Sequence, residues 1–383
     1  MTTRTTLQLP GHTELKDVYY IGLMSGTSMD AIDVALVHIK DDVLEVVNYN
    51  QYPIPNDLQL SVRSITDSST INKITELDVA LGEQFATAVQ QTLESTHIRS
   101  DEIKAIGSHG QTVLHLADAT YKRSLQIGDP NIIAYKTSIT TVADFRRLDI
   151  AAGGQGAPLA PAFHQWYFSD HSINRVILNI GGIANITVLP SDTNRPVLGF
   201  DTGPGNGLMD AWTQHHLNRD FDEDGKWAGS GIVDNSLLEI LLADPYFADI
   251  PPKSTGKENF NLNWLDKKLK LVPHSVQEKD IQATLLELTA RSISDAINEY
   301  ADSASEILIC GGGIHNPLLI NRLSEMQADC TIASTEIYGI HPDAVEAISF
   351  AWLAMCRIEN IESNIPSVTG AERTVTLGAV YQP

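Results

Sequence analysis

The sequence predicts an α/β protein made of two similar lobes, and three segments carry that prediction. Residues 19–37 and residues 175–189 each read as an apolar strand, a turn of small polar residues with glycine, and a strand of alternating polarity. This pattern is typical of a β-hairpin. Residues 306–317 read as a buried strand that runs into three glycines and a helix with proline in its first turn. The repeated hairpin pattern predicts an internal duplication in which each copy begins one lobe.

The length of the chain and the position of its glycines predict where the lobes divide. A chain of 383 residues is long enough for two domains that each bury a core. A Gly/Ala-rich stretch at 151–158 separates the two halves that begin with hairpins. We therefore expect a first lobe over residues 1–168 and a second over 169–367. The small-residue tail, 368–383, is expected to return to the first lobe.

The first lobe is expected to continue from its hairpin as an α/β layer. A third strand is predicted at 43–49, and apolar residues at helical spacing predict a core-facing helix over 71–94. Residues 103–113 read as a short buried strand with a polar, glycine-rich end. A Gly-Asp-Pro turn, a helical segment and a buried strand at 139–143 follow.

The second lobe repeats this plan. A strand at 196–200 is expected to end immediately before Asp201, with a helix from about Leu208. Residues 281–300 have the apolar spacing of a strong amphipathic helix, and residues 342–354 predict a helix with an acidic first turn.

Composition excludes several classes of function. The net charge is −22, and phosphate contacts need a basic face, so we expect no nucleic-acid partner. No apolar run is long enough to cross a bilayer, and Met1 to Lys16 lacks the apolar core of an export signal, so we expect a cytoplasmic protein without a membrane partner. Three widely spaced cysteines fit a reducing compartment and show no zinc spacing. A phosphorylated ligand would need local amide donors, arginines or a divalent metal, since the surface as a whole repels it.

Asp201 is the first candidate for chemistry. It precedes the turn Thr202-Gly203-Pro204-Gly205-Asn206-Gly207, whose glycines let a ligand approach the backbone closely. A carboxylate between a strand and such a turn suits a catalytic base. The alternative is a tight turn in which Asp201 caps the following helix.

Other polar residues stand where the predicted strands end, and each has a structural alternative. The turn Ser25-Gly26-Thr27-Ser28 offers hydroxyls and amides to an anion, or its hydroxyls bond their own backbone. His109 lines a ligand crevice or is a satisfied structural histidine. Arg146 captures a carboxylate or phosphate, or joins an Arg–Asp surface network. Glu346 projects into a cleft or favours the dipole of its helix.

The polar segment at 251–264 resembles a phosphate loop only superficially. It contains Lys253-Ser254-Thr255-Gly256-Lys257, but it lacks the GxxxxGK[ST] spacing and does not follow a strand. It therefore does not predict a phosphate loop of the P-loop type.

Two similar halves and a late strand–GGG–helix resemble the actin/sugar kinase/Hsp70 superfamily, whose lobes have the RNase H-like fold. Within it, the chain resembles the anhydro-N-acetylmuramic acid kinase family from about Tyr20 to Tyr381. Eight segments in order carry the resemblance: residues 24–30 (MSGTSMD), 107–113 (GSHGQTV), 126–129 (QIGD), 144–147 (DFRR), 152–159 (AGGQGAPL), 179–185 (NIGGIAN), 200–206 (FDTGPGN) and 310–313 (CGGG). One departure is Ala31, where the family usually has glycine.

The resemblance implies an activity, a fold and ligands. The family phosphorylates 1,6-anhydro-N-acetylmuramic acid with ATP and opens its anhydro bridge, in recycling of cell-wall peptidoglycan. ATP and Mg²⁺ would bind in a cleft between two actin-like ATPase lobes, with Asp30 as an outer-sphere partner of the metal. A homodimer is expected from the same resemblance.

The resemblance also implies site residues. Asp201 would be the general base that activates water, and Glu346 would orient the sugar or that water. The nucleotide would be bound by Gly26, Thr27, Ser28, Met29, Asp30, Ala31, Ile32, Asp33, Gly181, Gly182, Asn185, Gly311, Gly312, Gly313 and Asn316. The sugar would be bound by His109, Gln111, Arg146, Gly203 and Asn206.

Two other classes of function stay open at this point. One is an ordinary sugar kinase in which Asp201 deprotonates a free hydroxyl. The other is a nucleotide-driven interaction module, which would need a peptide-binding domain for which no residues are left over.

Overall fold

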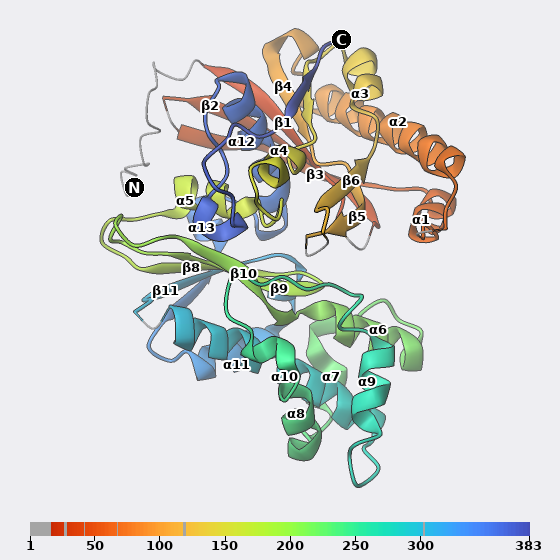
Figure 1. Ribbon diagram of the computed structural model, residues 1–383, viewed down its shortest axis with the longest axis vertical. Coiled ribbons are helices and arrows are strands. Elements are labelled where there is room, and N and C mark those ends of the chain that lie inside the picture. Colours follow the sequence, from red (N-terminus) through yellow and green to blue (C-terminus); the bar gives the residue numbers. More distant parts are fainter. Residues whose placement is uncertain (1–16, 27–28, 42, 67, 118–119, 302) are drawn as a thin grey trace. The chain divides into compact units, whose positions relative to one another are not determined.

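The computed structural model describes residues 17–26, 29–41, 43–66, 68–117, 120–301 and 303–383 (Figure 1). The chain divides into two compact units: Met1–Tyr167 with Ala344–Pro383 form unit 1, and Phe168–Asp343 form unit 2. None of the helices in the described ranges is long and apolar enough to cross a membrane.

Unit 1 is built on a six-stranded mixed sheet with the order β13-β7-β4-β1-β2-β3. Strands β1, β2 and β3 form an antiparallel meander, and β4 and β7 continue the sheet on the other side, parallel to β1. The bounds are Val18–Met24 (β1), Ala31–Lys40 (β2), Val43–Pro53 (β3), Ile103–Ser108 (β4), Thr141–Ala143 (β7) and Ala379–Tyr381 (β13). A separate hairpin is formed by β5 (Gln111–Leu116) and β6 (Arg123–Ile127). The sequence predicted one strand over 103–113, but the chain turns at Gly110, whose φ is +71°.

Helices cover both faces of the unit 1 sheet. On one face α2 (Ile71–Thr96) inserts Leu81 and Phe85 among Ile21 and Leu23 of β1. Gly22, between those two residues, points to the other face because successive strand residues alternate. The remaining helices are α1 (Asn56–Arg63), α3 (Pro130–Thr137), α4 (Arg147–Ala151), α5 (Ala160–Phe168), α12 (Val345–Ile358), α13 (Pro366–Thr369) and the short 3-10 helix Ser100–Glu102. A further 3-10 helix, Pro342–Ala344, contains the point in the chain at which unit 2 ends and unit 1 resumes.

Two glycines explain why the chain from Ala344 onward groups with unit 1. A Cβ on Gly22 would lie 1.8 Å from the carbonyl oxygen of Ala347, and a Cβ on Gly107 would lie 2.0 Å from that of Phe350. Helix α12 therefore rests directly on the backbone of β1 and β4. The sequence placed this return at residue 368, because the two docking glycines lie far from α12 along the chain.

Unit 2 repeats the topology of unit 1. Its five-stranded sheet has the order β10-β9-β8-β11-β12, with β8, β9 and β10 as an antiparallel meander and β11 and β12 parallel to β8. The bounds are Arg175–Ile180 (β8), Ile183–Leu189 (β9), Leu198–Pro204 (β10), Glu306–Cys310 (β11) and Thr331–Ser334 (β12). A meander followed by two parallel strands on its open side is the RNase H-like order. The predicted fold class and internal duplication are therefore confirmed.

The helices of unit 2 gather on one face of this sheet (Figure 1). The central one is α10 (Glu278–Tyr300), whose apolar side chains form one core with Phe200, Leu208 and Ile309. The others are α6 (Asn206–Leu217), α7 (Lys226–Gly229), α8 (Asn235–Leu242), α9 (Leu262–Leu269), α11 (Pro317–Met326) and the 3-10 helices Glu223–Gly225, Pro245–Ala248, Gly312–His315 and Thr335–Tyr338.

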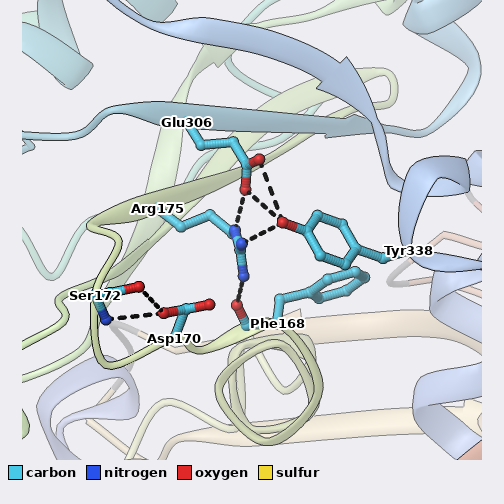
Figure 2. Close-up of polar contacts among 6 residues, drawn as sticks. All are labelled: Phe168, Asp170, Ser172, Arg175, Glu306 and Tyr338. Carbon is cyan, nitrogen blue, oxygen red and sulfur yellow. Dashed lines mark hydrogen bonds and ion pairs between the residues drawn. The ribbon is translucent and has the colours of Figure 1, made fainter. Parts of the chain in front are cut away.

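A buried arginine links the start of unit 2 to β11 and to the 3-10 helix Thr335–Tyr338 (Figure 2). Arg175, the first residue of β8, is 2% exposed and forms an ion pair with Glu306, its register partner on β11. The same guanidinium donates to the carbonyl oxygen of Phe168 and, over 2.5 Å, to the hydroxyl of Tyr338. Each side of the guanidinium is thereby satisfied, which a buried charge requires.

Candidate active site

Asp201 lies at a bulge inside strand β10. It pairs with Asn185 of β9, and the next pair is Gly203 with Ala184, so Thr202 is the extra residue. Gly203 has a φ of +149°, and a Cβ there would lie 2.8 Å from the ring of Phe247. The sequence predicted that this strand ends at Phe200, and that end is wrong. The bulge absorbs one residue, after which Gly203 and Pro204 resume the pairing.

The segment that the sequence analysis set aside wraps around Asp201. The amide of Thr255 donates to Oδ2 of Asp201 over 2.9 Å, and the amide of Asp201 donates to the carbonyl oxygen of Lys253 over 3.2 Å. The hydroxyl of Tyr246 donates to the carbonyl oxygen of Asp201 over 2.7 Å. We expected that residues 251–264 do not form a P-loop, and their hydrogen bonds to Asp201 are compatible with that expectation. The only signal in the sequence was the density of small polar residues in that segment.

Burial makes Asp201 a suitable proton acceptor. Loss of hydration raises the pKa of the carboxyl to about 7, while the Thr255 amide opposes that rise and the charge of Glu258 adds to it. A carboxyl with a pKa near neutrality can both take and release a proton under physiological conditions. Asp201 therefore has the chemistry of a general base.

A second carboxylate in unit 2, Asp210, was missed by the sequence analysis. It lies in the second turn of α6, four residues after Asn206 and hence on the same face of that helix. Burial raises the pKa of Asp210 to about 7, and the charge of Lys257 opposes that rise. The spacing of Asn206 and Asp210 after the glycine-rich turn was the available signal.

The turn between β8 and β9 packs against the start of α6. The carbonyl oxygen of Gly182 accepts from the amides of Gly205 (3.0 Å) and Gly207 (3.1 Å), and that of Gly181 accepts from the amide of Asn206 (2.8 Å). A Cβ on Gly205 would lie 2.3 Å from the carbonyl oxygen of Gly181, so a side chain there cannot fit. This packing places the glycine turn beside the bulge that carries Asp201.

A row of polar side chains crosses the same end of the sheet. Asn179 on β8 pairs with Asn185 on β9, which pairs with Asp201 on β10. Directly opposed residues on neighbouring strands have Cβ atoms about 5 Å apart, so these three side chains are neighbours. The predicted site residue Asn185 therefore lies next to Asp201.

The three glycines after β11 complete this end of unit 2. Gly311 has a φ of +78°, and a Cβ there would lie 2.2 Å from Oδ1 of Asn179. A Cβ on Gly313 would lie 2.3 Å from the side chain of Ile180, whereas Gly312 is exposed. Asn316 accepts a hydrogen bond from the amide of Leu319 over 3.2 Å and so caps α11. Gly311 and Gly313 therefore allow close packing, and Gly312 leaves its backbone exposed.

The predicted nucleotide residues of unit 1 lie at and after the turn between β1 and β2. Thr27 and Ser28 fall outside the described residues. The amide of Met29 donates to the carbonyl oxygen of Gly26 over 3.1 Å, and the side chains of Met29 and Ile32 are buried in the core. Any contact they make with a ligand would have to come from the backbone.

Asp30, Ala31 and Asp33, which were also predicted to bind the nucleotide, differ in exposure and in hydrogen bonding. Asp30 is exposed, and Ala31 begins β2 opposite Pro53. Asp33 accepts hydrogen bonds from Tyr49 (2.5 Å) and Gln51 (2.9 Å).

His109, which is buried, and Arg146, which is half-buried, form one hydrogen-bonded unit after β4 and β7. Nη2 of Arg146 lies 2.8 Å from Nε2 of His109, and Nη1 donates to the carbonyl oxygen of Gly156 over 2.8 Å. Arginine stays protonated, so Nε2 must accept and the proton of the neutral ring resides on Nδ1. Burial, and then the charge of Arg146, holds the pKa of His109 well below its usual value. The imidazole is therefore a neutral ring with one fixed tautomer.

A cavity of about 300 Å³ opens beside His109 within unit 1. Its lining includes Ser108, Gln126, Asp144 and Arg147. Arg147, which the sequence analysis did not choose, reaches this cavity and pairs with Asp144 over 2.7 Å. Gln111, predicted to bind the sugar, begins β5 and is buried.

Glu346 stands in the first turn of α12 and belongs to unit 1. Its side chain is open to solvent, but nearby protein atoms remove part of its hydration, and this raises its pKa. The charge of Asp33 adds to the rise and that of Arg146 opposes it. The two residues predicted to be catalytic, Asp201 and Glu346, thus lie in different units.

Comparison with known proteins identifies the family. The sequence model of the family described as anhydro-N-acetylmuramic acid kinase matches residues 18–383. The chain belongs to this family. Proteins named anhydro-N-acetylmuramic acid kinase from Coxiella burnetii and Photobacterium profundum are 52% and 49% identical over 365 and 371 residues. The alignments cover 94% of this chain in both cases and 97% and 98% of those relatives. A relative of the same name from Vibrio cholerae is 47% identical over 367 residues.

Membership of the anhydro-N-acetylmuramic acid kinase family confirms the predicted resemblance and makes the chain a sugar kinase. The family match extends over both units and every segment that carried the resemblance. The interaction-module alternative is therefore excluded.

The described ranges contain no group of three or more His, Cys, Asp or Glu side chains that could hold a metal ion by themselves.

Proposed function

We propose that this protein transfers the γ-phosphoryl group of ATP to O6 of 1,6-anhydro-N-acetylmuramic acid while water opens the anhydro bridge, with Asp201 as the base. The observation that carries the proposal is the Asp201 carboxyl, partly buried at a bulge, with a pKa of about 7 and one backbone amide fixing Oδ2. Family membership supplies the substrate named for its relatives.

The bonds change in one balanced sequence. Asp201 takes a proton from water, and the water oxygen attacks C1 of the sugar. The C1–O6 bond breaks, O6 bonds to the γ-phosphorus, and the bond between that phosphorus and the β–γ bridging oxygen breaks to release ADP. Asp201 then returns its proton to solvent. The products are N-acetylmuramic acid 6-phosphate and ADP.

One carboxylate suffices for this chemistry. An ordinary glycosidase uses a second carboxyl to protonate the leaving oxygen. Here the leaving oxygen bonds to the γ-phosphoryl group, so no carboxyl has to protonate it. Attack opposite the bridge inverts C1, and an inverting enzyme needs room for water beside its base. Thr202 and Gly203 are small but buried, and Gly203 packs against the ring of Phe247, so that room would have to lie on the solvent side of Asp201.

Unit 2 offers backbone and amide donors for the nucleotide. Gly181, Gly182 and Asn185 would meet the phosphates, and Gly311 to Gly313 with Asn316 would meet the adenosine. The glycines among these residues have no side chain that would keep a ligand from the backbone. Gly203 and Asn206 would contact the sugar beside Asp201.

Unit 1 would contribute to the same turnover. The turn at Gly26, Thr27 and Ser28, with the backbone through Asp33, would bind phosphate. Mg²⁺ would enter with ATP, held by phosphate oxygens and water, and Asp30 is an exposed carboxylate suited to a water-bridged contact. The metal would neutralise charge on the phosphates.

The sugar contacts that we assign to unit 1 are compatible with its hydrogen bonds. Nδ1–H of His109 is buried, and we assign it, together with Gln111, as a contact to the sugar. Arg146 would act through His109, whose tautomer it fixes, as well as on the lactyl carboxylate. Glu346 would orient the sugar or the attacking water. ATP as a substrate supports a cytoplasmic location, and a homodimer stays a prediction.

Incubation with the anhydro sugar, ATP and ¹⁸O-labelled water tests the proposal. We expect N-acetylmuramic acid 6-phosphate with ¹⁸O on C1. A phosphorylated sugar without the label would support an ordinary sugar kinase. No phosphorylated product at all would overturn the proposal.

A further inference from the structure

The segment that holds Asp201 also carries a lysine to the glycine turn of the second hairpin. Thr255 donates its amide to Asp201, and Lys257 follows two residues later. Cε of Lys257 lies 3.4 Å from the position that a Cβ on Gly182 would take. The end of the Lys257 side chain therefore lies against the glycine turn, where its ammonium would reach a ligand bound over that turn.

Asp210 lies within electrostatic reach of this lysine. The charge of Lys257 is near enough to Asp210 to oppose the effect of burial on that carboxyl. Asp210 lies on α6, whose first residues donate amides to Gly181 and Gly182. Lysine, carboxylate and glycine turn therefore belong to one cluster, defined here as Lys257, Asp210 and Gly182.

The two lysines of the segment differ in their surroundings. Lys253 donates to the carbonyl oxygen of Tyr246 over 3.2 Å and lies 4.9 Å from the centre of that ring. Burial lowers the pKa of Lys253. Lys257 has an exposed side chain beside the turn and is therefore the cation that a phosphate at that turn would meet.

The overall charge makes a local cation important. The chain has a net charge of −22, which disfavours the approach of a polyanion. Phosphoryl transfer depends on positive groups placed at the oxygens of the transferred group. Lysine is a compact point charge suited to that task.

We propose that Lys257 is a catalytic residue that binds the transferred phosphoryl group, and that Asp210 is a positioning residue that holds its ammonium at the Gly182 turn. This inference rests on the proposed kinase function. Two residues of extended chain span at most about 7 Å, so the segment links the cation closely to the amide that fixes the base. Water activation and phosphoryl transfer would then depend on one loop.

The experiment compares Lys257→Met, Lys257→Arg and the matched control Lys267→Met, an exposed lysine on α9. Turnover of the anhydro sugar is measured together with calorimetric binding of a non-hydrolysable ATP analogue and of ADP. We expect Lys257→Met to lower kcat about 10²–10³-fold, as for loss of one charge-stabilising donor. Its affinity should fall about tenfold for the ATP analogue and less than twofold for ADP. Lys257→Arg should restore part of kcat, and Lys267→Met should match the wild type.

Asp210→Asn tests the positioning role. We expect Asp210→Asn to lower the affinity for the ATP analogue more than the affinity for ADP, as Lys257→Met does. The double variant should bind both nucleotides as Lys257→Met alone does. Lys257→Met with kcat within twofold of the wild type, or with equal losses for the ATP analogue and ADP, would overturn the inference. If the wild type binds ATP but does not phosphorylate the sugar, the proposed function fails, and the ATP-against-ADP comparison still decides the role of Lys257.

Discussion

The backbone amide of Thr255 donates a 2.9 Å hydrogen bond to Oδ2 of Asp201. One carboxylate oxygen is thereby occupied, and the other is left to take a proton. Residues 54 positions apart in the chain thus define the base together.

Replacement of Asp201 by Asn should separate chemistry from binding. The amide keeps an oxygen for Thr255 but cannot take a proton, so we expect kcat to fall about 10²–10⁴-fold. Affinity for ATP, measured by calorimetry, should stay within a factor of two. Activity close to that of the wild type would remove Asp201 from the role of base.

The pH dependence of kcat/KM should report the same carboxyl. Asp201 must be deprotonated to act, and its pKa is raised to about 7, so kcat/KM should rise with pH up to about 7 and then level off. Glu258 contributes to the raised pKa of Asp201, so Glu258→Gln should move the acidic limb to lower pH. A profile already flat at pH 5 would contradict this assignment.

Stability should fall as the pH rises through the same range. Asp201 and Asp210 have pKa values of about 7 in the folded state against a usual 3.8. Between those values the folded state binds more protons than the unfolded state, so the free energy of unfolding decreases with pH. Asp201→Asn removes one such group, and urea unfolding at pH 8 should show a gain of about 1–3 kcal/mol. At pH 3.5 the variant and the wild type should be nearly equal.

His109 offers a test of the sugar contact in unit 1. Removing its Nδ1–H deletes one neutral hydrogen bond, worth about 0.5–1.5 kcal/mol. We therefore expect His109→Ala to raise KM for the anhydro sugar about 3–10-fold with little change in KM for ATP. Equal changes in both constants would instead assign His109 a structural role.

Arg175 offers a test of stability alone. Arg175→Met leaves Glu306 partly buried beside Tyr338 without its cation (Figure 2). Loss of one partner of a buried ion pair typically costs about 3–5 kcal/mol, and we expect that decrease in the free energy of unfolding. The double variant Arg175→Met/Glu306→Gln should recover part of it. A decrease under 1 kcal/mol in Arg175→Met would show that solvent reaches the pair.

Particular elements show which features the sequence alone could predict. The two hairpins and the amphipathic helix now defined as α10 depend on periodicity within one segment, and they were found. The eight segments that carried the family resemblance depend on residue identity in order, and the family match confirms them. Neither kind of signal requires knowing which distant residues meet.

Contacts between distant segments could not be predicted in this way. Helix α12 joins unit 1 because Gly22 and Gly107 leave room for its backbone. Arg146 turns to His109, while its neighbour Arg147 reaches the cavity. Each outcome depends on a side chain, or on its absence, far away in the chain.

The sequence by itself determined the duplicated α/β fold, the family and the choice of Asp201, because local patterning and residue identity suffice for these. The tertiary structure alone decided that β10 passes through Asp201, that Thr255 fixes its carboxylate and that Lys257 lies beside Gly182. Burial and hydrogen bonding depend on which segments pack together, and packing is a property of the folded chain rather than of any one stretch of it.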